Sequence, residues 1–127
     1  MKKIILDTNF LLIPYQFKVD IFSEIRRICD FNYSLFVIDK TVDELNRIVL
    51  SSKVKDRLAA VLALKLIAHA KVKEIKTGKE MDADLLIIKA ADRDTIVATQ
   101  DTALKSRLKQ KGAGIISLRK KDHLVIG

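Results

Sequence analysis

The chain has 127 residues, of which 49% are hydrophobic, so it can bury the core of one domain without disulfides or a structural metal. The single cysteine, Cys29, excludes an intrachain disulfide and fits a reducing interior. The net charge of +8 favours a polyanionic partner, most commonly nucleic acid, over a lysine-rich surface that only maintains solubility.

Two further classes of protein are excluded by sequence pattern. Aromatic residues make up 6% of the chain and do not alternate with basic ones, which argues against a base-stacking sheet. No apolar run approaches the roughly 20 residues of a membrane span. Lys2 and Lys3 begin what resembles a signal peptide, but Asp7 and Asn9 interrupt it and no cleavage site follows. We therefore expect one cytoplasmic domain over residues 1–127, without membrane contact.

The first half of the chain alternates short apolar runs with amphipathic stretches. KIIL (3–6) predicts a buried strand, and FKVDIFSEIRRICDF (17–31) predicts a helix because its apolar residues fall on one stripe. SLFVI (34–38) is a second apolar run of strand length. Two helices are expected next, TVDELNRIVL (41–50) and the segment 53–70.

The second half continues the alternation. VKEI (72–75) predicts a weaker strand, and a helix is expected over 82–92. TIVAT (95–99) has high β-propensity, and TALKSRLKQK (102–111) predicts a helix that ends at a glycine. GIISL (114–118) is the last expected strand.

Five strands therefore alternate with helices. Three of the strands are continuous apolar runs, which is typical of strands with both faces covered. We predict an α/β fold, a three-layer α/β/α sandwich with a central, mainly parallel five-stranded sheet. In such sheets ligands bind beyond the carboxyl ends of the strands, near the point where the strand order reverses.

Four acidic residues are expected at that end of the sheet. Asp7 follows the first strand directly, and Asp101 lies two residues beyond the strand 95–99. Glu44 lies in the first turn after the second strand, and Asp84 in the first turn of the helix that precedes the fourth. If the first and fourth strands are neighbours, these carboxylates converge on one crevice.

Each of these acids has a plainer explanation. Asp101 fits a helix N-cap, and Glu44 fits a capping box with Thr41. Asp7 has the weakest alternative, because a carboxylate at the end of a buried strand is costly to desolvate. Four acids together in a basic protein predict a cluster whose mutual repulsion requires a cation.

The ligand chemistry indicates which cation this is. A site of carboxylates and an amide, with no His or Cys, suits a hard divalent ion such as Mg²⁺ or Mn²⁺. An ion of this kind can activate water against a phosphodiester and stabilise the leaving oxygen. The surrounding lysines would then hold the nucleic-acid backbone.

These residues also carry a resemblance to a known family. ILDTN, VDEL, DADLLIIKAA and IVATQDTALKSRL resemble, in order and spacing, the four motifs of the PIN-domain ribonucleases. The resemblance spans essentially the whole chain and is most specific in the first and last motifs. It implies an endoribonuclease whose acids bind one or two Mg²⁺ or Mn²⁺ ions, supported by two polar residues. The matching acids are Asp7, Glu44, Asp84 and Asp101, and the supporting residues are Asn9 and Thr99.

Four other acids need separate interpretation. Asp82 and Asp84 lie two apart on a helix and point about 200° from each other, so only one can face the ion. We choose Asp84, because the apolar residues that follow it mark the core side, and leave Asp82 as an N-cap or a supporting residue. Asp39 is interpreted as a loop acid and Asp43 as solvent-facing.

The resemblance leaves the type of enzyme open. The basic helix after IVAT and the charge of +8 favour ribosomal-RNA processing, with a ribosome-assembly partner, over a VapC-type toxin paired with an antitoxin. A non-catalytic RNA- or protein-binding module and a phosphate-receiver-like domain are further alternatives. Lys105 and Arg107 are predicted phosphate contacts, against the alternative of a solvated face. The apolar helix 53–70 fits a homodimer contact or deep burial equally well.

Overall fold

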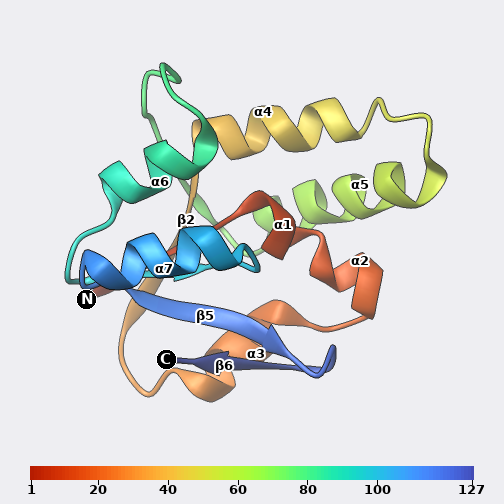
Figure 1. The fold of residues 1–127 in the computed structure, drawn as a ribbon. Coiled ribbons are helices and arrows are strands. Elements are labelled where there is room, and N and C mark those ends of the chain that lie inside the picture. Colours follow the sequence, from red (N-terminus) through yellow and green to blue (C-terminus); the bar gives the residue numbers. More distant parts are fainter.

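A six-stranded sheet runs through the centre of the molecule in the order β3-β2-β1-β4-β5-β6 (Figure 1). The computed structural model describes residues 1–127. Neighbouring strands from β3 to β5 pair in parallel, and β6 pairs with β5 in the antiparallel direction. The predicted fold class is confirmed, but the predicted count of five strands is wrong. The strands are β1 (Lys2–Leu6), β2 (Tyr33–Ile38), β3 (Lys73–Ile75), β4 (Thr95–Ala98), β5 (Gly114–Arg119) and β6 (His123–Ile126).

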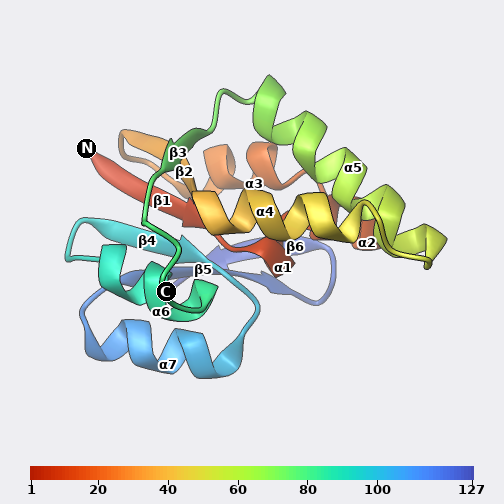
Figure 2. The ribbon, with the colours of Figure 1, turned by 90° about the horizontal axis from the view of Figure 1, so that it is seen from above.

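Helices cover both faces of this sheet (Figure 2). One face packs against the first five helices and the other against α6 and α7, each through its own buried cluster. The arrangement is a three-layer sandwich, as predicted. The helices are α1 (Thr8–Leu11), α2 (Ile13–Phe17), α3 (Ile21–Ile28), α4 (Asp39–Ile48), α5 (Val54–His69), α6 (Ala83–Ala90) and α7 (Thr102–Gln110).

The two clusters explain why the central strands read as continuous apolar runs. Successive side chains of a strand point to opposite faces, so a strand that is covered twice needs apolar residues at every position. In β1, Ile4 and Leu6 lie in the cluster under α3 to α5, whereas Ile5 lies in the cluster under α6 and α7. In β4, Ile96 and Val97 divide in the same way.

The strand order reverses at β1. The chain moves outward from β1 through β2 to β3, and then returns to place β4 on the other side of β1. Leu6 pairs with Ala98, so the residues that follow them, Asp7 and Thr99, leave the sheet side by side. The carboxyl ends of β1 and β4 therefore form the crevice in which ligands of such sheets bind.

The sixth strand escaped prediction because of its turn. Lys120 and Lys121 both have positive φ, at 54° and 61°, and the Asp122 N–H donates to the Arg119 carbonyl at 3.3 Å. A turn of this shape normally carries Asn and Gly, so two lysines conceal the hairpin. The edge strand is also fastened from outside, because Glu24 accepts from the Leu124 N–H at 2.9 Å.

The segment between β1 and α3 was also not predicted to be helical. Asp7 is the N-cap of α1, and its carboxylate accepts from the Thr8 N–H. Pro14 lies in the first turn of α2, where its missing N–H costs nothing. Two short helices thus follow the first strand at once. None of the helices is long and apolar enough to cross a membrane.

Candidate active site

Asp7 is the central residue of the crevice. It is 5% exposed, and both of its carboxylate oxygens are bonded. Oδ1 accepts from the Thr8 N–H at 2.8 Å, and Oδ2 accepts from the Thr99 hydroxyl at 2.7 Å. Burial raises the pKa of the Asp7 carboxyl, and this outweighs the opposing effect of the two hydrogen bonds; Asp84 and Glu44 raise the pKa further. Two predicted site acids are therefore close enough to Asp7 to oppose its ionisation.

Glu44 reaches the same place from α4. Its Oε1 accepts from the Thr8 hydroxyl at 3.0 Å, so Thr8 bonds Asp7 through its backbone and Glu44 through its side chain. The capping box predicted for Thr41 and Glu44 is wrong, because α4 begins at Asp39, two residues earlier. The Thr41 hydroxyl is instead buried without a hydrogen-bond partner.

Asp84 and Asp101 lie at the starts of the two helices on the other face. The pKa of Asp84 is raised by partial burial first, then by Asp101 and Asp82, and Arg107 opposes the shift. Asp82 is the N-cap residue of α6, although its side chain makes no capping bond. Asp101 caps α7 by accepting from the Leu104 N–H at 3.0 Å. Asp84, rather than Asp82, is the acid of α6 that affects Asp7.

Thr99 and Asn9 join these elements together. The Thr99 hydroxyl donates to Asp7 and accepts from the Asp101 N–H at 3.1 Å, so one buried side chain connects two of the acids. Asn9 does not bond Asp7 directly; its Oδ1 accepts from the Gln100 N–H at 3.2 Å. The Gln100 side chain in turn accepts from the Leu118 N–H at 2.7 Å, which ties the loop after β4 to β5.

Sequence reasoning missed two residues of this region. Thr8 gives no signal beyond its place between Asp7 and Asn9, because its bond to Glu44 spans 36 positions of the chain. Asp39 was predicted to be a loop acid, but it is only 8% exposed and is the first residue of α4. Its carboxylate accepts from the Thr77 N–H at 2.9 Å and from the Thr77 hydroxyl at 2.6 Å.

Asp39 thereby fastens the connection between β3 and α6 to the start of α4. Lys40 adds a bond to the Met81 carbonyl at 2.7 Å, and Asp43 pairs with Lys79 at 2.7 Å. The Asp43 side chain is 43% exposed, in keeping with its predicted outward position. Because this connection leads directly into α6, the same contacts place Asp84 opposite Asp7.

The residues of the crevice fit a hard divalent ion by their chemistry. They offer carboxylate, hydroxyl and amide oxygens and no sulfur or imidazole, which is the preference of Mg²⁺ and Mn²⁺. Their mutual effect on the pKa values of Asp7 and Asp84 is a repulsion that a cation would relieve. As the side chains stand, no three Asp, Glu, His or Cys residues are grouped closely enough to hold a metal ion. The fit is one of oxygen chemistry and position.

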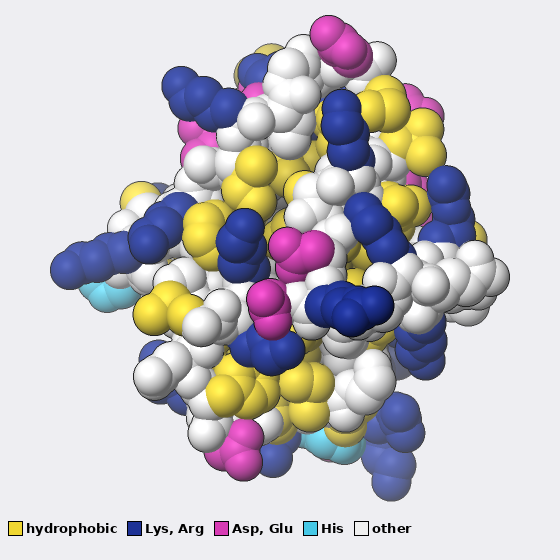
Figure 3. Space-filling model, turned by 90° about the vertical axis from the view of Figure 1, so that its left-hand side faces the viewer, with side chains coloured by type: hydrophobic (Ala, Val, Ile, Leu, Met, Phe, Trp, Pro, Cys, Tyr) yellow, Lys and Arg dark blue, Asp and Glu magenta, His cyan; other side chains and the backbone are white.

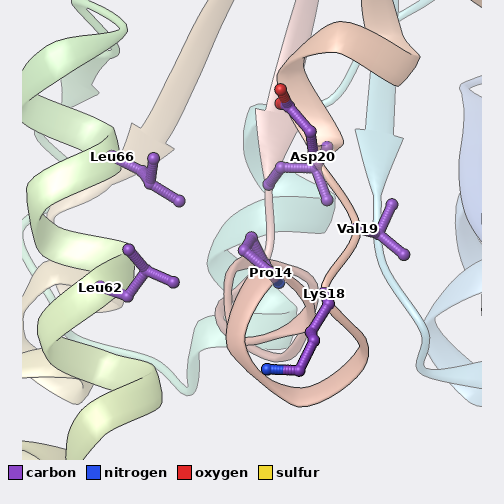
Figure 4. Close-up of a pocket in the computed structure, with 7 residues that line it drawn as sticks. Pro14, Lys18, Val19, Asp20, Leu62 and Leu66 are labelled. Atoms are coloured by element: carbon purple, nitrogen blue, oxygen red, sulfur yellow. The ribbon is translucent and has the colours of Figure 1, made fainter.

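Basic side chains spread around a few acidic ones on the face shown in Figure 3. Arg107 of α7 lies toward Asp84, whereas Lys105 lies against β5 and lines a different hollow. A third hollow of about 300 Å³, between the α2–α3 connection and α5, is lined by Pro14, Leu62 and Leu66 among others (Figure 4). None of the four predicted site acids lines it.

Comparison with known proteins decides the family. Residues 4–121 match the family described as PIN like domain. Ribonuclease VapC9 of Archaeoglobus fulgidus is 32% identical over 124 residues, which cover 96% of this chain and 87% of that protein. The chain belongs to the PIN-domain ribonuclease family. The resemblance in the four motifs is thereby confirmed.

Two further relatives agree with this assignment. Ribonuclease VapC4 of Methanocaldococcus jannaschii is 30% identical over 128 residues, covering 99% of this chain and 97% of that protein. The structure of the PIN domain endonuclease Utp24 superposes with a TM-score of 0.78 at 22% identity, covering 98% of this chain and 90% of that one. The superposition shows that the sheet order and helix layers described above are a PIN fold.

Proposed function

We propose that this PIN-domain protein is a divalent-metal-dependent endoribonuclease that acts in the cytoplasm, with residues 1–127 forming one functional domain. The observation that carries the proposal is the environment of Asp7. A nearly buried carboxylate is bonded on both oxygens, yet two further acids oppose its ionisation. Such an arrangement destabilises the protein alone and favours a bound cation.

The four acids divide the work between them. Asp7, Glu44, Asp84 and Asp101 would hold one or two Mg²⁺ or Mn²⁺ ions, with Asp7 in the centre. A bound ion supplies an activated water and stabilises the leaving oxygen of the phosphodiester. The protein groups around it orient the ligands: the Thr99 hydroxyl holds Asp7, and its bond from the Asp101 N–H fixes the start of α7.

The remaining predicted residues have supporting roles in this proposal. Thr8 orients Glu44, and Asn9 holds the loop after β4 through Gln100. Asp82 contributes negative charge behind Asp84. Arg107 is placed to meet a phosphate at the acids, because it already lies toward Asp84.

Cleavage of a mixed RNA with and without metal tests the proposal. We expect products with Mg²⁺ or Mn²⁺, none in EDTA, and none with Asp7→Asn or Glu44→Gln. Asp43→Asn is the matched control, because it removes an exposed acid from the same helix as Glu44, and it should cleave normally. Cleavage that persists in EDTA would contradict the metal mechanism. RNA that is bound but never cut would favour a non-catalytic binding module.

Two biological settings remain for such an enzyme. The basic helix after β4 and the charge of +8 suit the maturation of structured RNA, including ribosomal RNA, alongside an assembly partner. The two VapC relatives favour instead a toxin that is inhibited by an antitoxin. A small protein encoded beside this one that binds it and abolishes RNA cleavage would establish the toxin. Defective ribosomal RNA ends in cells that lack the protein would establish processing.

A further inference from the structure

A basic groove lies next to the acids, between α7 and the last two strands. It has a volume of about 310 Å³, and we call it the α7–β5 groove. Three cations and a hydroxyl supply its polar lining, and short aliphatic side chains form its floor. The lining residues are Lys105, Lys109, Ile115, Ser117, Arg119, Val125, Ile126 and Gly127.

The three cations of the groove have no acidic partner. Lys105, Lys109 and Arg119 take part in none of the ion pairs of the molecule, and no acidic side chain lines the groove. Partial burial lowers the pKa of the Lys105 ammonium first, and Lys109 and Arg119 lower it further. Like charges gathered in a hollow are relieved by an anion, just as the neighbouring acids are relieved by a cation.

The groove leads directly away from the acids. Lys105 lies one helical turn beyond Asp101, which is close enough to favour its charge, and Lys109 lies one turn further. At 1.5 Å per residue, Lys109 is about 12 Å along the helix axis from Asp101. Arg107, two residues from each lysine, faces α6 instead. The two predicted phosphate contacts therefore belong to different places: Arg107 to the acids and Lys105 to the groove.

We propose that the α7–β5 groove binds the phosphate backbone of the RNA strand on one side of the cleaved bond, several ångströms from the acids. This inference rests on the proposed function and adds a second binding site to it. Three cations and the Ser117 hydroxyl would contact phosphate and ribose oxygens. The groove has no aromatic residue on which a base can stack, so its binding is independent of sequence.

Binding of a labelled 12-nucleotide RNA at several salt concentrations tests the groove. The protein carries Asp7→Asn so that the RNA stays whole, with or without Lys105→Gln, Lys109→Gln and Arg119→Gln. We expect the triple change to weaken binding by about 10- to 100-fold and to make the salt dependence shallower by about 2, from roughly 0.7 per lost phosphate contact on a single strand. The matched control is Lys53→Gln, Lys55→Gln and Lys65→Gln at exposed sites of the α5 region, on the opposite face of the sheet.

The outcomes separate the groove from the proposed function. An equal loss of affinity in the control, or no loss in the groove variant, overturns the groove. Displacement of the RNA by polyglutamate as readily as by unlabelled RNA also overturns it. If the wild-type protein cuts no RNA but the groove variant alone loses binding, the groove stands and the nuclease proposal fails. If the triple variant is unfolded, the double variant at the exposed Lys109 and Arg119 gives the same test.

Discussion

Asp7 sets a conflict between the stability of the protein and its function. Because burial raises the pKa of its carboxyl above the ordinary 3.8, the folded state holds its proton more tightly than the unfolded state. The free energy of unfolding therefore falls as pH rises from about the ordinary pKa through the raised one, and it stays lower at neutral pH. We predict that Asp7→Asn raises the melting temperature at pH 7 in EDTA, because an amide needs no ionisation.

Thermal melts of both proteins between pH 4 and pH 8 check this prediction. The difference between the two melting temperatures should be small at pH 4 and widen towards pH 8, because only the wild-type carboxyl titrates. A variant that is less stable than the wild type at pH 7 would show that the two hydrogen bonds to Asp7 matter more than its burial.

Thr99 gives a second prediction at the scale of a residue. Thr99→Val keeps the shape but removes the hydroxyl that donates to Asp7 and accepts from the Asp101 N–H. The loss of the donor raises the pKa of Asp7 further and frees both ligands to move. We expect Mn²⁺ affinity, measured by calorimetry, to fall by about 10- to 100-fold, the usual cost of losing a ligand's hydrogen-bond partner. Thr99→Ser should restore most of it; failure of the serine variant would implicate packing instead.

At the scale of elements, α4 acts as a support for α6. The Asp39 carboxylate accepts two bonds from Thr77 and one from the Lys40 N–H, and these bonds lower its pKa against the effect of burial. We predict that Asp39→Ala lowers the free energy of unfolding by about 1.5 to 3 kcal/mol, the range for hydrogen bonds to a charged group. Because the pKa is lowered, this stabilisation is present at neutral pH and is lost as pH falls through the folded-state pKa.

Urea unfolding at pH 7 and pH 4 measures the effect, with Asp43→Ala as the control from the same helix. Asp43 makes only a half-exposed ion pair with Lys79, so its loss should cost less than about 1 kcal/mol. Equal costs for the two variants would mean that the bonds to Thr77 do not hold the connection in place.

The same elements show where sequence reasoning succeeds and fails. Strands and long helices were predicted because burial imposes a period on their apolar residues. Asp39 was misread because its partner, Thr77, lies 38 residues away and leaves no local pattern. The β5–β6 hairpin was missed because lysines occupy its two positive-φ positions. Local patterns thus reveal the elements, and tertiary contacts decide what a polar residue at an element's end does.

At the scale of the whole molecule, the fold follows from the order of the apolar runs, whereas the site does not. The positions of Asp7 and Asp101 at one edge follow from parallel strands that adjoin at the switch point. Neither the separation of Glu44 from Asp7 nor the role of Thr8 between them follows from spacing. The family resemblance supplied the set of acids, and the structure adds how each one is held.

The whole molecule should also respond to the metal as one cooperative unit. An ion that binds only the folded state adds about 2.7 kcal/mol at a concentration of 100 times its dissociation constant. We therefore predict that Mn²⁺ raises the melting temperature of the wild type at pH 7 and leaves Asp7→Asn unchanged, so that the variant is the more stable protein in EDTA and the less stable one in Mn²⁺. The rise should shrink as pH falls and protons occupy Asp7 and Asp84, whose pKa values are raised. A wild type that melts at the same temperature at every Mn²⁺ concentration, or a variant that gains as much as the wild type, would place the ion elsewhere than at Asp7.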